Sequence, residues 1–296
     1  MKLANIVMDQ EIRVVGVHVD ATGTKYIDLH AREEDFPPTI ESILFEDPDF
    51  AWTRQEFAQS LADKNFVTGD LLPPVFDPGK ILCIGLNYKD HALETKAEIP
   101  SEPVVFSKFS STITAPEQPI VIPRVSEKVD FEAELVAVIG IPGKNITEKD
   151  ALKHVAGYCC GNDVSARDWQ KGRPAGQWLL GKTPDTFAPL GPWFVTSDEV
   201  GDAQNLAIKL RLNGETMQDG HTSQMIFPIP KLIAHISQLI TLETGDLIFT
   251  GTPAGVGIAR DPKVFLKSGD VIEIEIEKLG LLRNNVIHEN EVVTEE

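Results

Sequence analysis

Two glutamates, Glu132 and Glu134, open the most strand-like segment of the chain, residues 129–140. The residues after Glu134 are apolar, mostly β-branched, and end at a glycine, which is typical of a strand that enters a core. Residues two apart in a strand point to the same face of a sheet. The sequence therefore predicts two carboxylates side by side at the edge of a hydrophobic interior, where like charges repel and resist desolvation.

A divalent cation would compensate such a pair, and ligands made only of oxygen favour Mg²⁺, Mn²⁺ or Ca²⁺ over zinc. Asp163 lies in a turn after a later apolar stretch and could supply a third carboxylate. An aspartate in such a turn is, taken alone, more often a helix cap. Arg167 and Asp168 follow closely, and we expect them to form an internal structural pair.

His91 and Glu94 are three residues apart in a short segment that Asn87 or Asp90 could cap as a helix. Both side chains would then lie on one face of that helix. A carboxylate beside an imidazole orients the ring and raises its basicity, as a general base requires. From this motif alone, a surface pair without function is the slightly better interpretation.

Lys182 lies in an irregular stretch of small residues and could balance the carboxylates or hold an oxyanion. An ordinary surface lysine is the alternative interpretation. Residues 250–257 follow a predicted strand and are rich in glycine, so their amides could approach an anionic ligand. A tight loop without a ligand is the simpler interpretation of that segment.

Residues 176–183 match the G-x-x-x-x-G-K-[ST] pattern of a nucleotide-binding loop. Such a loop needs a buried strand before it and a helix after it. Here no strand-like segment precedes the pattern, and the prolines after it cannot sustain a helix. We therefore expect no nucleotide to bind.

The formal net charge of −18, from 45 acidic and 27 basic residues, argues against nucleic acid as a partner. A small anionic substrate would need local positive charge against this overall field. The three cysteines, two of them adjacent, suggest reduced thiols rather than disulfides. With no signal-like or membrane-length apolar run, we expect a soluble cytoplasmic protein with no membrane partner, or a mitochondrial one if a targeting peptide is missing.

The pattern of predicted elements indicates an α+β fold with a β-rich body rather than a doubly wound sheet. Residues 1–72 are expected to form a small N-terminal α+β domain, with a hairpin around residues 21–24. Residues 73–79 are rich in helix breakers and form the candidate linker, and residues 80–296 form the larger domain. Within it, Thr147 is a plausible cap for a helix over residues 147–154.

Taken together and in this order, these segments resemble the fumarylacetoacetate hydrolase family over about residues 80–286. The matching stretches are residues 85–94, 130–134, 162–168, 181–186, 224–227 and 251–257. The resemblance implies a mixed β-roll or sandwich catalytic domain, usually a homodimer, that holds Mg²⁺, Mn²⁺ or Ca²⁺. It implies that the metal ligands are Glu132, Glu134 and Asp163. The catalytic residues it implies are His91, Glu94 and Lys182, and the substrate contacts are Gln170, Thr252 and Lys108.

The sequence also departs from the fumarylacetoacetate hydrolases proper. These have a fourth metal carboxylate, a tyrosine further ahead of the catalytic histidine, and a second substrate tyrosine where this chain has Pro174. The departures argue against fumarylacetoacetate itself as the substrate. The resemblance implies a small 2-oxo acid whose enolate the metal stabilises, with oxaloacetate tautomerisation or decarboxylation ahead of acylpyruvate hydrolysis. A hydratase or isomerase of aromatic catabolism, and a catalytically silent scaffold, are the alternatives.

Overall fold

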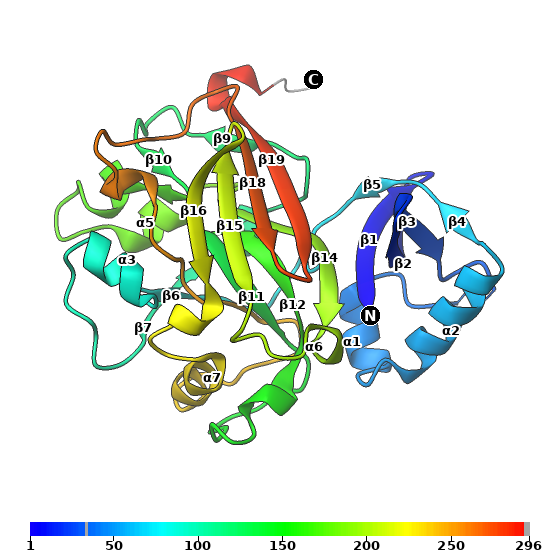
Figure 1. Ribbon diagram of the computed structural model, residues 1–296. Helices are drawn as coiled ribbons and strands as arrows, with labels where there is room; N and C mark the ends of the chain where they lie inside the picture. The colour runs from blue at the N-terminus through cyan, green and yellow to red at the C-terminus, as the bar shows by residue number, and fades with distance from the viewer. Residues whose placement is uncertain (33–34, 293–296) are drawn as a thin grey trace.

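The long mixed sheet of the molecule begins in the N-terminal lobe and continues through the body. The computed structural model describes residues 1–32 and 35–292, and over these residues the sheet has 12 strands. Its main path runs in the order β4-β3-β2-β1-β14-β12-β11-β17-β6-β7. Figure 1 shows the smaller lobe, coloured blue, at one side of the larger β-rich body.

The N-terminal lobe is a meander of strands covered by two helices. Its elements are β1 (Lys2–Met8), β2 (Glu11–Asp20), β3 (Gly23–Asp28), α1 (Ile40–Glu46), α2 (Ala51–Ala62), β4 (Phe66–Val67) and β5 (Asp70–Leu71). Strands β2 and β3 form the hairpin that the sequence predicts. The lobe has no core of its own among the described residues, because its side chains Leu3, Val14 and Ile40 pack in one cluster with Val136 and Phe249 of the body.

The sheet continues from the lobe into the body because β1 pairs antiparallel with β14. Backbone hydrogen bonds therefore join the two parts of the chain that lie on either side of the candidate linker. The strands that complete this sheet are β6 (Ile81–Gly85), β7 (Val104–Lys108), β8 (Ile113–Thr114), β11 (Ala133–Ile139), β12 (Val155–Asn162), β14 (Ala188–Thr196) and β17 (Leu247–Phe249). Every residue of β11 and β12 is buried, because each strand has a neighbour on both edges and cover on both faces.

A second, five-stranded sheet lies against β11 and β12, as Figure 1 shows. Its strands are β9 (Ile120–Ile122), β15 (Ala207–Leu212), β16 (Glu215–His221), β18 (Val271–Ile276) and β19 (Gly280–His288). Strand β18 buries alternate residues, as its alternating sequence predicts. A short pair formed by β10 (Val129–Asp130) and β13 (Ser165–Ala166) joins the segments that carry the predicted site.

The body also contains five short α-helices among its described residues. They are α3 (Lys89–Glu94), α4 (Arg167–Gln170), α5 (Trp178–Lys182), α6 (Ser197–Val200) and α7 (Ile229–Ser237). The predicted helix over residues 147–154 is wrong in type, because only Ala151–His154 is helical and it is a 3₁₀ turn. Its hydrogen bonds join residues three apart, from Asp150 to Thr147 and from Lys153 to Asp150.

The architecture confirms the predicted α+β fold with a β-rich body. None of the helices within residues 1–32 and 35–292 is long and apolar enough to cross a lipid bilayer.

Candidate active site

Three buried carboxylates meet where β11 begins and β12 ends. These strands are antiparallel, with Ala133 opposite Asn162, so Glu132 lies beside Asp163. The backbone N–H of Asp163 donates to the carbonyl of Glu132 over 2.9 Å. One oxygen from each of Glu132, Glu134 and Asp163 lies within 4.8 Å of the others. The structure thus brings together the three residues that the sequence predicts as metal ligands.

Lys182 neutralises two of these carboxylates from α5. Its Nζ donates to Oε2 of Glu132 over 2.8 Å and to Oδ2 of Asp163 over 2.6 Å. Burial works to lower the pKa of Lys182, but Asp163 and Glu132 outweigh it and raise this pKa. Lys182 is therefore a buried cation that balances the carboxylates, and not a surface lysine.

Glu134 is the carboxylate left without a basic partner in the part of the chain that the structure describes. Its Oε2 accepts from the backbone N–H of Gly251 over 2.7 Å. Burial, followed by the charges of Asp163 and Glu132, raises the pKa of Glu134 well above its ordinary value. A cation between the three carboxylates would remove this penalty, and a set of carboxylate oxygens suits Mg²⁺, Mn²⁺ or Ca²⁺. The donor set thus fits a hard divalent ion.

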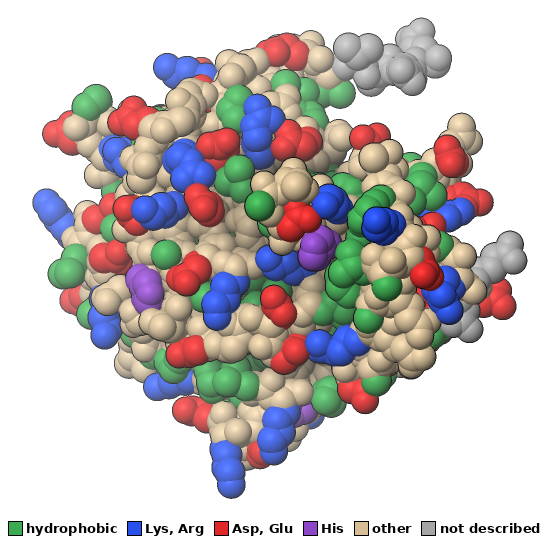
Figure 2. All heavy atoms as spheres, turned by 45° about the vertical axis from the view of Figure 1, so that its right-hand side comes forward, with side chains coloured by type: hydrophobic (Ala, Val, Ile, Leu, Met, Phe, Trp, Pro, Cys, Tyr) green, Lys and Arg blue, Asp and Glu red, His purple; other side chains and the backbone are tan. Residues whose placement is uncertain are grey.

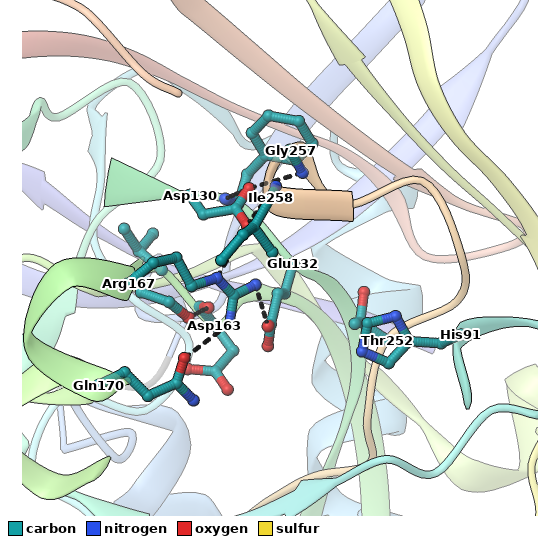
Figure 3. A network of polar contacts seen from close by, with 12 residues as sticks. His91, Asp130, Glu132, Asp163, Arg167, Gln170, Thr252, Gly257 and Ile258 are labelled. Atoms are coloured by element: carbon teal, nitrogen blue, oxygen red, sulfur yellow. Dashed lines mark hydrogen bonds and ion pairs between the residues drawn. The ribbon is translucent and has the colours of Figure 1, made fainter. Parts of the chain in front are cut away.

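Arg167 on α4 joins the metal-site carboxylates to their surroundings, as Figure 3 shows. Its guanidinium donates to Oδ2 of Asp130 over 2.8 Å, to Oε1 of Glu132 over 2.6 Å and to Oε1 of Gln170 over 2.9 Å. The predicted Arg167–Asp168 pair is wrong, because Asp168 instead accepts from the Ser126 hydroxyl and the Glu127 amide. Arg167 is a residue of the candidate site that the sequence analysis missed, because it lines the cavity and bonds to Glu132.

Asp130 is the second residue that the sequence analysis missed. It is fully buried and accepts from the amides of Gly257 and Ile258 over 2.7 and 3.1 Å as well as from Arg167. These bonds attach the end of the glycine-rich segment to β10. A signal was present, because Asp130 continues the two-residue spacing of Glu132 and Glu134.

His91 and Glu94 lie on one face of α3, as their spacing predicts. Nδ1 of His91 lies 2.7 Å from Oε1 of Glu94, and Oε2 of Glu94 accepts from the Gly255 amide over 2.9 Å. A carboxylate at Nδ1 selects the tautomer with the proton on Nδ1, which leaves Nε2 free to accept a proton. Neither expected residue caps the helix, because its N-cap is Tyr88, and the Asn87 side chain bonds to Phe227 and Thr250 instead.

A cavity of about 130 Å³ lies between His91 and the two glutamates, Glu132 and Glu134. Its polar lining includes His91, Glu132, Glu134, Arg167, Gln170, Lys182 and Thr252. Its apolar wall includes Phe106 and Trp178, whose rings pack edge to face with centroids 5.6 Å apart. In Figure 3, His91 faces the carboxylates from the side opposite Arg167.

Gln170 and Thr252 lie in the cavity wall but differ in what they offer a ligand. Oε1 of Gln170 accepts from Arg167, which leaves its Nε2 amide to donate. The Thr252 hydroxyl donates to the Ala133 carbonyl and accepts from Gln218, both over 2.8 Å. The single hydroxyl proton of Thr252 is therefore already donated, so this hydroxyl could only accept a hydrogen bond from a ligand.

Lys108 lies behind the carboxylates. It is not among the described residues that line the cavity. Its Nζ donates to the carbonyls of Val164, Lys182 and Phe187 over 3.0, 2.6 and 2.8 Å. It also lies 2.7 Å from Oδ1 of Asp163, without hydrogen-bond geometry because its three protons go to the carbonyls. Burial lowers the pKa of Lys108 although Asp163 opposes the shift.

The segment that matches the nucleotide-loop pattern forms the five-residue helix α5. Residues 171–177 before it are irregular, and a 9-residue strand, β14, begins a few residues after it. The match therefore lacks the strand–loop–helix context that nucleotide binding requires.

Comparison with known proteins places this geometry in a family. Residues 80–287 match the family described as "Fumarylacetoacetate (FAA) hydrolase C-terminal". The chain belongs to this family. The match confirms the resemblance that the sequence motifs indicate, and the family is generally dependent on a divalent metal.

Relatives and a solved structure match nearly the whole chain. The "Oxaloacetate tautomerase fahd2, mitochondrial" of Xenopus laevis is 47% identical over 270 residues, which is 90% of this chain and 83% of that protein. The "Oxaloacetate tautomerase FAHD2A, mitochondrial" of Homo sapiens is 46% identical, over 93% of this chain and 88% of that protein. A fumarylacetoacetate hydrolase from psychrophilic Exiguobacterium antarcticum has a TM-score of 0.81 at 33% identity, covering 98% of this chain and 100% of that one.

Proposed function

We propose that this protein is an enzyme that interconverts the keto and enol forms of oxaloacetate and depends on a divalent cation, Mg²⁺ or Mn²⁺. The observation that carries the proposal is the cavity itself, which His91 lines together with Glu132, Glu134 and the buried Lys182, while a carboxylate oxygen of Asp163 lies within 4.8 Å of those of the two glutamates. Relatives that are 46–47% identical over most of the chain are named oxaloacetate tautomerases, which supports this choice of substrate.

A divalent cation held by Glu132, Glu134 and Asp163 would act as a Lewis acid that stabilises negative charge on the oxygens of a 2-oxo acid. Nε2 of His91 accepts the proton when the C3–H bond of the keto form breaks, and the electron pair forms the C2–C3 double bond. The π electrons of the C2 carbonyl move onto its oxygen, and the protonated Nε2 of His91, directly or through a water molecule, returns the proton to that oxygen to complete the enol and restore the base. Glu94 keeps the ring in the tautomer that this step needs.

Lys182 supports the same step as an electrostatic residue. Its ammonium is fixed between Glu132 and Asp163, so it meets developing charge on a substrate oxygen without having to reorganise. The Gln170 amide is free to hold a substrate carboxylate or hydroxyl. The cavity of about 130 Å³ suits a small acid.

The direct test follows the enol absorbance of oxaloacetate with Mg²⁺ while pyruvate is measured in the same sample. Tautomerase activity gives faster relaxation of the enol signal without pyruvate, and a His91→Ala variant loses the acceleration. Pyruvate formation at the same rate would instead identify a decarboxylase. No change in either signal would remove oxaloacetate as the substrate.

Hydrolysis of a C–C bond in an acylpyruvate is the second candidate. It is favoured by the likeness to the Exiguobacterium fumarylacetoacetate hydrolase, and the His91–Glu94 dyad could equally activate a water molecule. Loss of the absorbance of an acylpyruvate, with formation of pyruvate and a second acid, would identify this activity. Tautomerisation of oxaloacetate alone would exclude it.

Assembly and compartment are parts of the proposal that need separate measurements. We propose a homodimer, which light scattering after size-exclusion chromatography would test. The relatives are named as mitochondrial, and cell fractionation of the full-length protein would decide between mitochondria and cytoplasm.

A further inference from the structure

A second hollow, of about 450 Å³, opens beside the catalytic cavity and shares part of its wall. Arg167, Lys171 and Ile258 line both spaces. The remaining residues of the hollow come from three segments of the chain: Lys128, Asp168, Gly172, Arg173, Lys263 and Phe265. We call this space the basic hollow, because five of its lining residues are cationic and, among the described residues that line it, Asp168 is the one acid.

Backbone hydrogen bonds fix the three segments relative to one another. The amide of Arg167 donates to the Lys128 carbonyl over 2.9 Å. The amide of Leu266 donates to the Val129 carbonyl over 2.8 Å, and that of Val264 donates to Gly257 over 3.1 Å. The basic hollow is therefore built by the same framework that places Asp130 and Glu132, and its charges are not a chance gathering of mobile loops.

Of the cations of the basic hollow, Arg167 is paired with Asp130 and Glu132, but the three lysines are not neutralised by the described residues. Asp168 is engaged by the Ser126 hydroxyl and the Glu127 amide. Lys128, Lys171 and Lys263 have no ion-pair partner among the residues that the structure describes. Burial, and then the nearby charge of Arg167, lower the pKa of the Lys171 ammonium. The charge of Arg167 thus acts on Lys171, and both residues line the basic hollow as well as the catalytic cavity.

This local charge is opposite in sign to that of the molecule. A net charge of −18 repels a doubly charged acid, whereas fixed cations within a Debye length of about 8 Å attract it at physiological ionic strength. On the face drawn in Figure 2, Lys and Arg side chains are interspersed with Asp and Glu. A cation-rich hollow next to the reactive groups is therefore a distinct electrostatic feature.

We propose that the basic hollow is a subsite for the second negative group of the substrate, through Lys128, Lys171 and Lys263, and that it makes the enzyme prefer dianionic 2-oxo acids over monoanionic ones. This inference rests on the proposed function, since it takes the 2-oxo carboxylate head to lie in the catalytic cavity. The inference adds residues that determine substrate specificity among 2-oxo acids. They are different residues from those that contact the reacting atoms.

A matched pair of unreacted probes tests the subsite directly. 2-Oxoglutarate and 2-oxopentanoate have the same chelating head and the same number of carbon atoms, and they differ in one distal carboxylate. Their dissociation constants for the Mg²⁺-loaded protein are measured by calorimetry at ionic strengths of about 0.01 and 1 M, where the Debye length is about 30 and 3 Å. We expect tighter binding of the dianion, and we expect the difference to shrink in high salt.

The decisive variant is K128Q/K171Q/K263Q, which should weaken 2-oxoglutarate about tenfold, equivalent to about 1.4 kcal/mol, and 2-oxopentanoate less than about twofold. The control K64Q/K144Q/K149Q removes the same charge from exposed lysines outside the basic hollow and should leave the preference intact. Circular dichroism checks that both variants are folded.

The outcomes separate this inference from the proposed function. An undiminished preference in the triple variant, or an equal loss in the control, would overturn the subsite while leaving the head-group site in place. Equal affinity of the wild-type protein for both probes would do the same. Failure of both probes to bind would contradict the proposed function and, with it, the subsite.

Discussion

Arg167 donates from Nη2 to Oε1 of Glu132 over 2.6 Å, and this bond joins α4 to the residue just before β11. The same guanidinium holds Asp130 and Gln170. Substituting Arg167→Met leaves the buried Asp130 without its counter-ion and leaves Glu132 with Lys182 alone, and we expect the free energy of unfolding to fall by about 3–5 kcal/mol. Urea denaturation measures this loss.

The control for that substitution is Arg173→Met, since Arg173 is exposed and stacks on Trp169. It should change the free energy of unfolding by no more than about 1 kcal/mol. Arg167→Lys keeps the charge but cannot serve three acceptors with a fork of donors, so it should fall between the two. A loss below about 1 kcal/mol for Arg167→Met would show that Arg167 does not carry the network.

Lys108 provides a test that separates positioning from substrate contact. Because its ammonium bonds to three carbonyls beside Asp163, Lys108→Met should lower the free energy of unfolding by about 3–5 kcal/mol. Thermal unfolding with and without Mg²⁺ measures this change. Unaltered stability together with a raised KM would instead indicate that Lys108 contacts the substrate.

Glu94→Gln tests whether the carboxylate selects the tautomer of His91. The amide oxygen of glutamine can still accept from Gly255, but its NH₂ group would donate to Nδ1 and place the ring proton on Nε2. We expect kcat to fall by about 10²–10⁴-fold, with little change in melting temperature.

His91→Ala should lose activity to a similar degree, and the double variant should be no worse, because the two residues act as one unit. Activity of Glu94→Gln above half that of the wild-type protein would contradict the assigned tautomer. Losses that multiply in the double variant would show that the two residues act independently.

Glu41 predicts a pH dependence of stability away from the active site. Its Oε1 accepts from the Phe76 amide, and burial raises the pKa of this carboxyl above its ordinary 4.5. The carboxyl of Glu41 therefore holds its proton more tightly in the folded state than in the unfolded state. Its contribution to the free energy of unfolding falls as pH rises from about 4.5 through the folded-state pKa.

Glu41→Gln removes that loss, because glutamine does not ionise. We expect the variant to be more stable than the wild-type protein by about 1 kcal/mol at neutral pH and equal to it near pH 4. Glu46→Gln, at the exposed end of the same helix, should change stability by less than about 0.5 kcal/mol. A gain for Glu41→Gln at pH 4 as large as at pH 7 would contradict the assigned cause.

The sequence predicts the parts of the site that follow local periodicity. Glu132 and Glu134 share a face because they are two apart in a strand, and His91 and Glu94 share a face because they are three apart in a helix. The β-rich class and the hairpin of the N-terminal lobe also follow from alternation and turn residues.

Other parts of the site and of the fold depend on contacts between segments that are distant in the sequence. The spacing of residues within one segment cannot predict such contacts. By sequence Arg167 could pair with its neighbour Asp168, but α4 lies against β13, which pairs with β10, and Arg167 bonds to Asp130 and Glu132 instead. The sequence shows no run of Lys or Arg, yet folding gathers cations from residues 128, 167–173 and 263 around one hollow. The continuous sheet that joins the N-terminal lobe to the body depends in the same way on pairing between distant strands, β1 and β14.

The most direct test of the account is a titration of Mn²⁺ into the metal-free protein, followed by electron paramagnetic resonance. Glu132, Glu134 and Asp163 offer oxygens within 4.8 Å of one another, so the account predicts one tightly bound Mn²⁺ per chain. Asp163→Asn should lose this binding, and Asp150→Asn, at an exposed turn, should keep it. Absence of bound Mn²⁺ in the wild-type protein, or equal binding by Asp163→Asn, would contradict the account.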